Sequence, residues 1–185
     1  MPALAQERSY TIDDIYALPD GERAELIDGQ IYYMAPPTRK HQDIVGELFG
    51  TIREYIKSKN GSCRCYVAPF AVFLNKNDTN YVEPDISVIC DISKLNDKGC
   101  AGAPDWIIEI ASSSNRPMDY YTKLFKYRTA GVREYWIVDP DSKSVQTFTL
   151  EKGYYTAKDF GTASDKVKVE VLEECVIDLS AVFSE

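Results

Sequence analysis

Two carboxylates stand in stretches of the sequence that otherwise favour a dry protein interior. Asp85 follows Pro84 in "YVEPDISVIC" (81–90), and Glu109 lies late in the apolar run "WIIEIA" (106–111). An isolated carboxylate is costly to bury. If adjacent strands bring the two carboxylates together, their like charges require a cation between them. Oxygen ligands alone favour a hard cation such as Mg²⁺, Mn²⁺ or Ca²⁺.

A simpler arrangement also accounts for this pair: Asp85 caps a turn and Glu109 pairs with a lysine. Lys123 is the candidate for that lysine, because it shares one helix face with Asp119 and Tyr127, four residues to either side. That face would cover the sheet, whereas Lys126 points elsewhere. Near a carboxylate–metal site, Lys123 would orient a water and stabilise charge on a phosphate. Otherwise it is a lysine whose stem lies along aromatic rings.

Two further residues could reach the same cleft. His41 precedes Ile44 and Leu48 by three and seven residues, so it extends the apolar stripe of a helix inward. It is either a catalytic group or a hydrogen-bonded core histidine. Glu25 begins an apolar strand in "AELIDG", and it is either a third acidic site residue or an exposed glutamate at a strand end.

Periodicity and turn residues predict the elements that would position these side chains. Asp28-Gly29 is a tight-turn signal, so residues 23–37 are predicted to form a hairpin. Apolar residues at helical spacing predict helices, and short apolar or alternating runs predict strands. The predicted helices are 11–19, 41–61 and 116–131, and the predicted strands are 65–74, 85–90, 106–111, 133–140, 144–150, 153–160 and 166–171.

This order of elements predicts an α/β fold with a mixed sheet flanked by helices, followed by a tail rich in β-hairpins. The passage from 106 to 138 reads as strand, helix, strand, which predicts a parallel crossover. A length of 185 residues suits a single domain over 1–185.

Charge and cysteine content bear on partners and compartment. A net charge of −8 argues by itself against nucleic-acid binding. However, residues 116–133 contain five basic residues and one acid, which forms either a solvated helix face or a contact surface. No apolar run approaches the ~18 residues of a membrane span, and "MPALAQERSY" has no apolar signal-peptide core. Five cysteines, an odd number, predict reduced thiols and a cytoplasmic location.

Several of these segments together carry a family resemblance. They are "ELIDGQIYYMAPP" (25–37), His41, "EPDISVI" (83–89), "APDWIIEIASSSN" (103–115), "DYYTKLFKYRTAGVREYWIVDP" (119–140) and "VIDLSAVF" (176–183). They resemble the Uma-two family of restriction endonucleases, in the PD-(D/E)XK nuclease superfamily. The resemblance spans about residues 10 to 183, and it implies a restriction-endonuclease-like fold and Mg²⁺-dependent hydrolysis of phosphodiester bonds.

The resemblance also assigns roles. Asp85 matches the superfamily's Pro-Asp aspartate, and Glu109 matches its (D/E) position. Ala111 stands where a lysine is expected, and Lys123 on the following helix is taken to replace it. Ser113 stands where the family usually has proline, which affects the loop more than the chemistry. The predicted ligands of Mg²⁺ or Mn²⁺ are Asp85, Glu109 and the carbonyl of Ile110, with Lys123 positioning a water.

The resemblance implies nucleic acid as the partner, with DNA as the expected substrate. A two-fold homodimer is expected as well, because it would match the symmetry of a duplex. The proposed dimer interface is the tail, through Tyr154, Tyr155 and Phe160. Two alternatives stay open: a catalytically weak or inactive dimeric scaffold of the same fold, and a phosphodiesterase that acts on small nucleotides.

Overall fold

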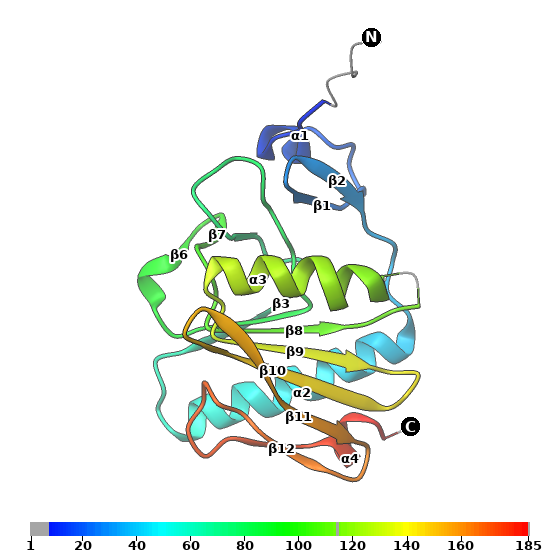
Figure 1. Ribbon diagram of the computed structural model, residues 1–185, viewed down its shortest axis with the longest axis vertical. Coiled ribbons are helices and arrows are strands. Elements are labelled where there is room, and N and C mark those ends of the chain that lie inside the picture. Colours follow the sequence, from blue (N-terminus) through cyan, green and yellow to red (C-terminus); the bar gives the residue numbers. More distant parts are fainter. Residues whose placement is uncertain (1–7, 114, 185) are drawn as a thin grey trace.

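A computed structural model describes residues 8–113 and 115–184 of the chain. Its centre is a mixed sheet of six strands, in the order β11-β10-β9-β8-β5-β3 (Figure 1). The strands β8 and β9 pair in parallel, and the other neighbours are antiparallel. The bounds are β3 Arg64–Val67, β5 Ile86–Ile89, β8 Trp106–Ile110, β9 Glu134–Asp139, β10 Ser144–Glu151 and β11 Tyr154–Thr162.

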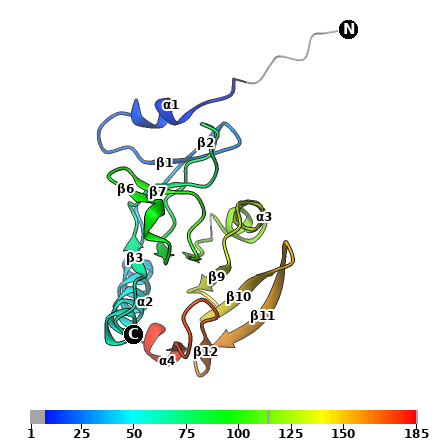
Figure 2. The ribbon, with the colours of Figure 1, turned by 90° about the vertical axis from the view of Figure 1, so that its left-hand side faces the viewer.

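Helices cover both faces of this sheet. The long helix α2 (Arg39–Ser58) lies on one face, and the π-helix η2 (Met118–Lys123), continued by α3 (Leu124–Ala130), lies on the other (Figure 2). Strand alternation separates the two cores. In β8, Ile108 packs with the residues of α2, whereas Ile107 packs with Tyr127 of α3. Glu109 comes two residues after Ile107, so its side chain lies on the same face of β8 and points toward α3.

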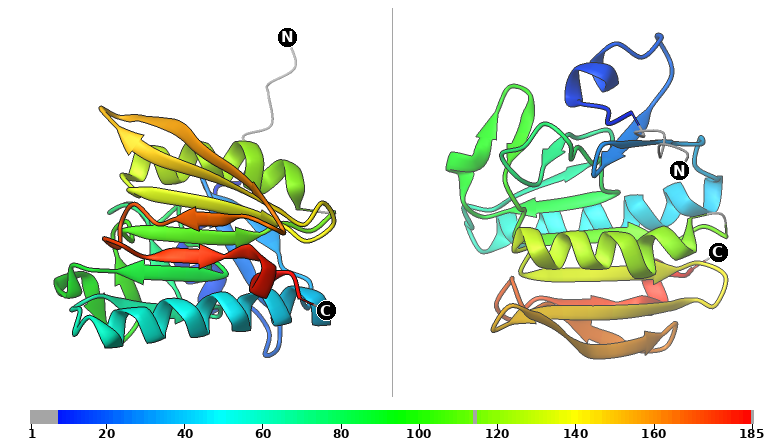
Figure 3. Two further views of the ribbon diagram at one scale, coloured as in Figure 1. Left: turned by 90° about the horizontal axis from the view of Figure 1, so that it is seen from below. Right: turned by 45° about the horizontal axis from the view of Figure 1, so that its top comes forward.

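The predicted hairpin near the N-terminus is present. Strands β1 (Ala24–Ile27) and β2 (Gln30–Tyr33) pair across Asp28 and Gly29, which both have positive φ, at 50° and 76°. A two-residue turn with both φ values positive matches the twist of a hairpin. The hairpin lies with α1 (Ile12–Tyr16) beside the sheet of β4 (Val72–Phe73), β6 (Leu95–Asn96) and β7 (Gly99–Ala101) (Figure 3, right). The short helix η1 (Ile92–Lys94) directly precedes β6.

After the main sheet, β12 (Lys166–Lys168) and β13 (Val176–Asp178) form another antiparallel pair, followed by α4 (Leu179–Val182). Their apolar residues complete the core under α2 (Figure 3, left). The predicted α/β class, with a mixed sheet flanked by helices and a hairpin-rich tail, is therefore confirmed. No helix in the described ranges is both long enough and apolar enough to cross a membrane.

Two details of the predicted elements were wrong. The single strand expected over 65–74 is divided into β3 and β4, which belong to different sheets. Pro69 lies between them, and proline cannot donate a hydrogen bond to a strand ladder. The helix expected over 116–131 begins as a π-helix over 118–123 and becomes an α-helix only at Leu124. The N-terminal residues 1–7, where a signal peptide was not expected, lie outside the described ranges.

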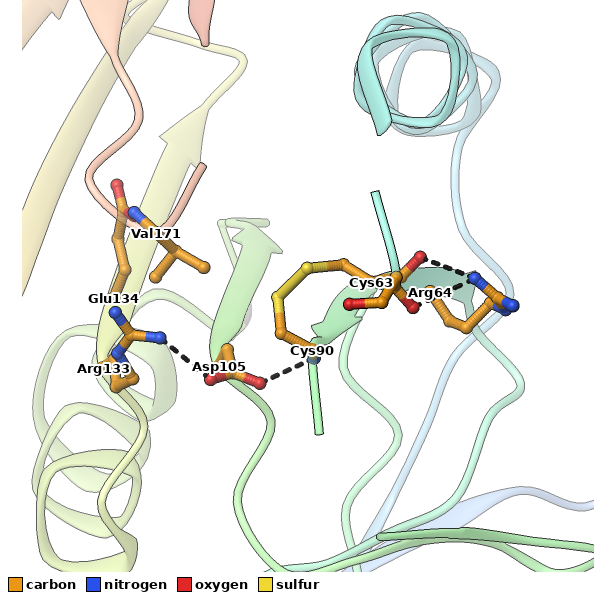
Figure 4. Close-up of a disulfide and its surroundings, with 8 residues drawn as sticks. Cys63, Arg64, Cys90, Asp105, Arg133, Glu134 and Val171 are labelled. Carbon is orange, nitrogen blue, oxygen red and sulfur yellow. Dashed lines mark hydrogen bonds and ion pairs between the residues drawn. A yellow bond between two sulfur atoms is a disulfide. The ribbon is translucent and has the colours of Figure 1, made fainter. Parts of the chain in front are cut away.

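The expectation that all cysteines are reduced was also wrong, because Cys63 and Cys90 form a disulfide (Figure 4). Arg64 pairs with Ile89 in the antiparallel ladder of β3 and β5. One further step of this register places the two cysteines opposite each other, with their Cα atoms 3.9 Å apart. The other three cysteines, Cys65, Cys100 and Cys175, are free. The disulfide removes the support that the cysteine content lent to a cytoplasmic location.

Candidate active site

Asp85 and Glu109 face each other across two neighbouring strands. In the antiparallel ladder of β5 and β8, Ile86 pairs with Ile108, and one further step places Asp85 opposite Glu109. Each residue contacts the backbone beside the other. The amide of Ile110 donates to Asp85 Oδ2 at 2.8 Å, and the amide of Asp85 approaches Glu109 Oε2 at 3.4 Å. The structure thus brings together the two carboxylates that sequence reasoning singled out.

Lys123 lies against this pair on the inner face of the helical segment η2. Its Nζ is 2.9 Å from Glu109 Oε1 and 2.9 Å from Glu25 Oε2, and it lies 3.9 Å from Asp119 Oδ1. All four side chains are buried. Glu109 therefore does pair with a lysine, as the simpler arrangement required, and this lysine belongs to a cluster of carboxylates rather than to an isolated ion pair.

Glu25 reaches the cluster because β1 runs beside the segment that leads into Asp85. Leu26 and Tyr81 exchange two backbone hydrogen bonds, of 2.7 and 2.8 Å. Glu25 directly precedes Leu26, and its Oε1 accepts a hydrogen bond from the amide of Glu83 at 3.0 Å. The N-terminal hairpin thus carries the third carboxylate to the start of β5, although almost 60 residues of sequence separate them.

His41 contacts the carboxylate of Asp85. It lies in the first turn of α2, where its Nε2 is 3.2 Å from Asp85 Oδ2. The side chains of His41 and Asp85 are 16% and 15% exposed, about three times as much as those of Glu109 and Lys123. Solvent therefore reaches the cluster from the side of His41 and Asp85. The Nδ1 atom of His41 is buried, with no hydrogen-bond partner among the described residues.

The electrostatics of the cluster follow from four carboxylates that face one ammonium in a dry environment. Burial raises the pKa of Glu109 well above its ordinary value, the nearby Asp85 raises it further, and Lys123 only partly offsets this. Burial likewise raises the pKa of Asp119 to about 7. Burial alone would lower the pKa of Lys123, but Glu109, Glu25 and Asp119 outweigh it and raise that pKa well above its ordinary value. Lys123 is therefore an ammonium, and the raised pKa values of Glu109 and Asp119 show that this single charge does not offset burial and the repulsion among the carboxylates.

Sequence reasoning missed the tyrosines that support the cluster. Tyr127 is buried and its hydroxyl donates to Glu109 Oε1 at 2.6 Å. Tyr135 donates to the backbone carbonyl of Asp119 at 3.0 Å, which ties η2 to β9. The signal for Tyr127 was its spacing of four residues from Lys123, which predicted a shared helix face but no contact with Glu109.

The donor set fits a magnesium-like cation only in part. Within residues 8–113 and 115–184, no three His, Cys, Asp or Glu side chains have the arrangement of a metal site. Mg²⁺, however, keeps several waters and is usually bound through only one or two carboxylates. Asp85 and Glu109 supply two carboxylates from neighbouring strands, and a cation between them would relieve the repulsion that helps to raise the pKa of Glu109. The residues present are thus compatible with Mg²⁺ or Mn²⁺.

Comparison with known proteins identifies the family. A family model described as "Uma2: Putative restriction endonuclease" matches residues 12–180, which is most of the chain. The chain belongs to this family. Asp85, Glu109, Lys123, Glu25 and His41 all fall within the part of the chain that matches Uma2.

The Uma2 fold is also found in a solved structure. A crystal structure from Anabaena variabilis ATCC 29413, described as "a putative nuclease belonging to DUF820", matches with a TM-score of 0.73 over 94% of this chain and 97% of that chain. The two sequences are 23% identical, so the likeness establishes the shared fold. No curated protein matches this Uma2 chain.

Proposed function

We propose that this chain is a metal-dependent endonuclease that hydrolyses phosphodiester bonds in nucleic acid, with DNA as the substrate. The observation that carries the proposal is the convergence of Asp85 and Glu109 from opposite strands, with Lys123 Nζ 2.9 Å from Glu109. Two carboxylates can hold a hard cation beside a phosphate. A neighbouring ammonium stabilises the charge that develops on that phosphate.

Asp85 and Glu109, together with the backbone carbonyl of Ile110, are the proposed ligands of one Mg²⁺ or Mn²⁺. When bound, such an ion polarises the scissile phosphate and lowers the pKa of a water ligand. Asp85 is suited to hold its carboxylate in one orientation, because it accepts from the amide of Ile110 and contacts His41 Nε2. His41 is therefore proposed as a positioning residue.

Lys123 is the proposed electrostatic stabiliser. Glu25 and Glu109 hold its ammonium from two sides, so the charge is positioned before the substrate arrives. Positioned charge needs no reorganisation during the reaction, which is why it lowers the barrier efficiently. Glu25 is proposed to keep Lys123 in place and to orient a water or a second metal ion.

The direct test is incubation of the purified protein with single- and double-stranded DNA and RNA, with and without Mg²⁺ or Mn²⁺. Lys123→Ala should lower kcat by about 10²–10³-fold, as the loss of one electrostatic stabiliser does, with little change in KM. Lys126→Ala is the matched control, because Lys126 pairs with the exposed Asp28 at the hairpin turn.

Each other outcome of this test has a definite meaning. Equal losses in the two lysine variants would show that the helix supplies only diffuse positive charge. Metal binding without hydrolysis of any nucleic acid would favour the inactive scaffold. Hydrolysis of small nucleotides alone would favour a phosphodiesterase.

A two-fold homodimer of single-domain chains belongs to the same proposal. Phe160 on β11 is exposed, which supports an interface in the tail, whereas Tyr154 lies beside the guanidinium of Arg128, and the half-buried Tyr155 donates to the carbonyl of Val132. Light scattering at micromolar concentration should return the mass of a dimer, and a monomer would contradict this part. A cytoplasmic location belongs to the same proposal, because a nuclease has to meet its nucleic-acid substrate inside the cell.

A further inference from the structure

The basic segment 116–133 carries far less free charge than its composition predicts. Four of its five basic side chains are already engaged with carboxylates in the described structure. Arg116 pairs with Asp139 and Asp141, Lys123 with the buried cluster, Lys126 with Asp28, and Arg133 with Asp105 (Figure 4 shows the last pair). Arg128 is the exception: within the described ranges it makes no ion pair, and its Nε is buried without a hydrogen-bond partner.

Aromatic rings surround Arg128 instead of carboxylates. Its guanidinium lies 5.0 Å from the ring centre of Phe125 and 5.8 Å from that of Tyr154. Phe125 is 52% exposed and Tyr154 is 69% exposed, and Tyr121, one turn before Phe125, is 75% exposed. Figure 2 shows how this arises, since the tip of the β10–β11 hairpin reaches toward the outer side of α3. We call Tyr121, Phe125, Arg128 and Tyr154 the outer strip of α3.

The outer strip and the candidate active site lie on opposite sides of one helical segment. Lys123 and Tyr127 point inward to Glu109, while Tyr121 and Phe125 point to solvent. Tyr121, the first residue of the strip, comes two residues after the buried Asp119. Both belong to η2, which also contributes Lys123 to the cluster. The width of one helix, about 10 Å, therefore separates the strip from the cluster, a distance that neighbouring nucleotides of a bound strand can span.

We infer that the outer strip binds unpaired nucleotides of the nucleic-acid substrate, with bases stacked on Phe125 and Tyr121 and a phosphate paired with Arg128. The inference rests on the proposed nuclease function and narrows its substrate to nucleic acid with a single-stranded segment. Every base has a flat π-face that stacks on an aromatic ring, but a duplex hides these faces. Arg128 already lies over the rings of Phe125 and Tyr154, and its planar guanidinium can still pair with a phosphate.

The test measures binding without metal, so it requires no cleavage. A fluorescein-labelled single-stranded DNA of mixed sequence, an abasic strand of the same length and a blunt duplex are titrated in EDTA, with fluorescence anisotropy as the readout. Phe125→Ala should weaken binding to the single strand by roughly 5- to 30-fold, the effect expected from losing one stacked base. Arg128→Lys keeps the charge but loses the planar stack, and it should weaken binding severalfold.

Two controls separate stacking from charge and from folding. Tyr33→Ala removes an aromatic ring that is 66% exposed on β2, away from the strip, and should bind like wild type. On the abasic strand, wild type and Phe125→Ala should bind equally, because no base is present to stack. Thermal unfolding of Phe125→Ala and Tyr33→Ala should match wild type, since the substituted rings are exposed.

Three results would overturn the inference. The first is equal affinity of wild type and Phe125→Ala for the single strand. The second is a loss of affinity of Phe125→Ala for the abasic strand that equals its loss for the single strand. The third is a change in the oligomeric state of Phe125→Ala, measured by light scattering. The last result would make the strip a protein interface. The nuclease proposal is judged separately: metal-dependent cleavage with unchanged binding by Phe125→Ala refutes only the strip, whereas stacking-dependent binding without cleavage refutes only the nuclease.

Discussion

Replacing Lys123 by methionine tests whether the buried cluster is organised around one ammonium. Methionine has nearly the same length, so the change removes charge with little change in packing. In the structure, Lys123 Nζ lies within 4 Å of three carboxylates, and all of these side chains are about 5% exposed. Breaking a buried ion pair by removing one partner typically costs about 3–5 kcal/mol. We expect a loss of unfolding free energy of that size at pH 8.

The loss should shrink as the pH falls. Glu109 already has a raised pKa in the wild type because of burial and Asp85, and removing Lys123 raises it further. An acid whose pKa is higher in the folded than in the unfolded state binds more protons when folded, so stability falls as pH rises between the two values. Each pH unit in that window changes the free energy by up to ~1.4 kcal/mol per group. At pH 5 to 6, the carboxylates of Lys123→Met take up protons, so the difference in unfolding free energy between this variant and wild type becomes smaller.

A divalent cation should partly rescue this variant. An ion between Asp85 and Glu109 would restore positive charge, and a ligand at 100 times its Kd adds ~2.7 kcal/mol to the stability of the folded state. The assay is urea unfolding followed by circular dichroism, at pH 6 and pH 8, with and without Mn²⁺.

Lys126→Met is the control for this assay. Lys126 pairs with Asp28, whose side chain is 64% exposed, and such a pair contributes only about 0–1 kcal/mol. The reasoning is refuted if the two variants lose the same stability at pH 8, or if Lys123→Met is equally destabilised at both pH values.

Further predictions concern single groups. Calorimetry should detect a Mn²⁺ site in wild type that Asp85→Asn removes and Asp28→Asn keeps; no binding to wild type at millimolar Mn²⁺ would exclude the proposed ligands. Tyr127→Phe removes the hydroxyl that holds Glu109 Oε1 and should lower both stability, by about 1–2 kcal/mol, and Mn²⁺ affinity. Tyr155→Phe loses a bond to the backbone carbonyl of Val132, which is not part of the cluster, and should lower stability alone, so equal Mn²⁺ affinities in the two variants would contradict a positioning role for Tyr127. Burial raises the pKa of Asp119 to about 7, so its ionisation lowers stability as pH rises from about 4 through 7. Urea unfolding at pH 5, 6.5 and 8 should therefore show a weaker pH dependence in Asp119→Asn, and parallel curves would count against this assignment. Burial raises the pKa of Cys65 to about 12, and those of Cys100 and Cys175 to about 11. The native protein should therefore resist iodoacetamide at pH 8 when followed by mass spectrometry, whereas rapid alkylation would show that these thiols are accessible.

Local patterns in the sequence determined the elements and the direction of the main side chains. The Asp28-Gly29 turn predicted the first hairpin, because few other residue pairs tolerate two positive φ values. Alternation in "WIIEIA" assigns Glu109 to the same face of its strand as Ile107. Helical spacing assigns Lys123 and Tyr127 to one face, and that face does cover Glu109. These features depend on neighbours within a few residues, which is the range over which backbone geometry acts.

Tertiary structure alone decided which of these groups meet. The register of β5 against β8 sets Asp85 opposite Glu109, and the register of β3 against β5 sets Cys63 opposite Cys90. A shift of one residue in either ladder would have turned these side chains to other partners or to the other face. Register depends on the packing of whole strands against both cores, and no short stretch of sequence contains that information.

The same reason explains the charges. The sequence contains five basic residues between 116 and 133. The fold pairs four of them with carboxylates and places the fifth, Arg128, beside two aromatic rings. Two of the partner carboxylates, Glu25 and Asp28, lie about 100 residues away in the chain. Coulomb interactions depend on distance in space rather than in sequence, so the sequence determined how much charge is present and the tertiary structure decided where it remains unpaired.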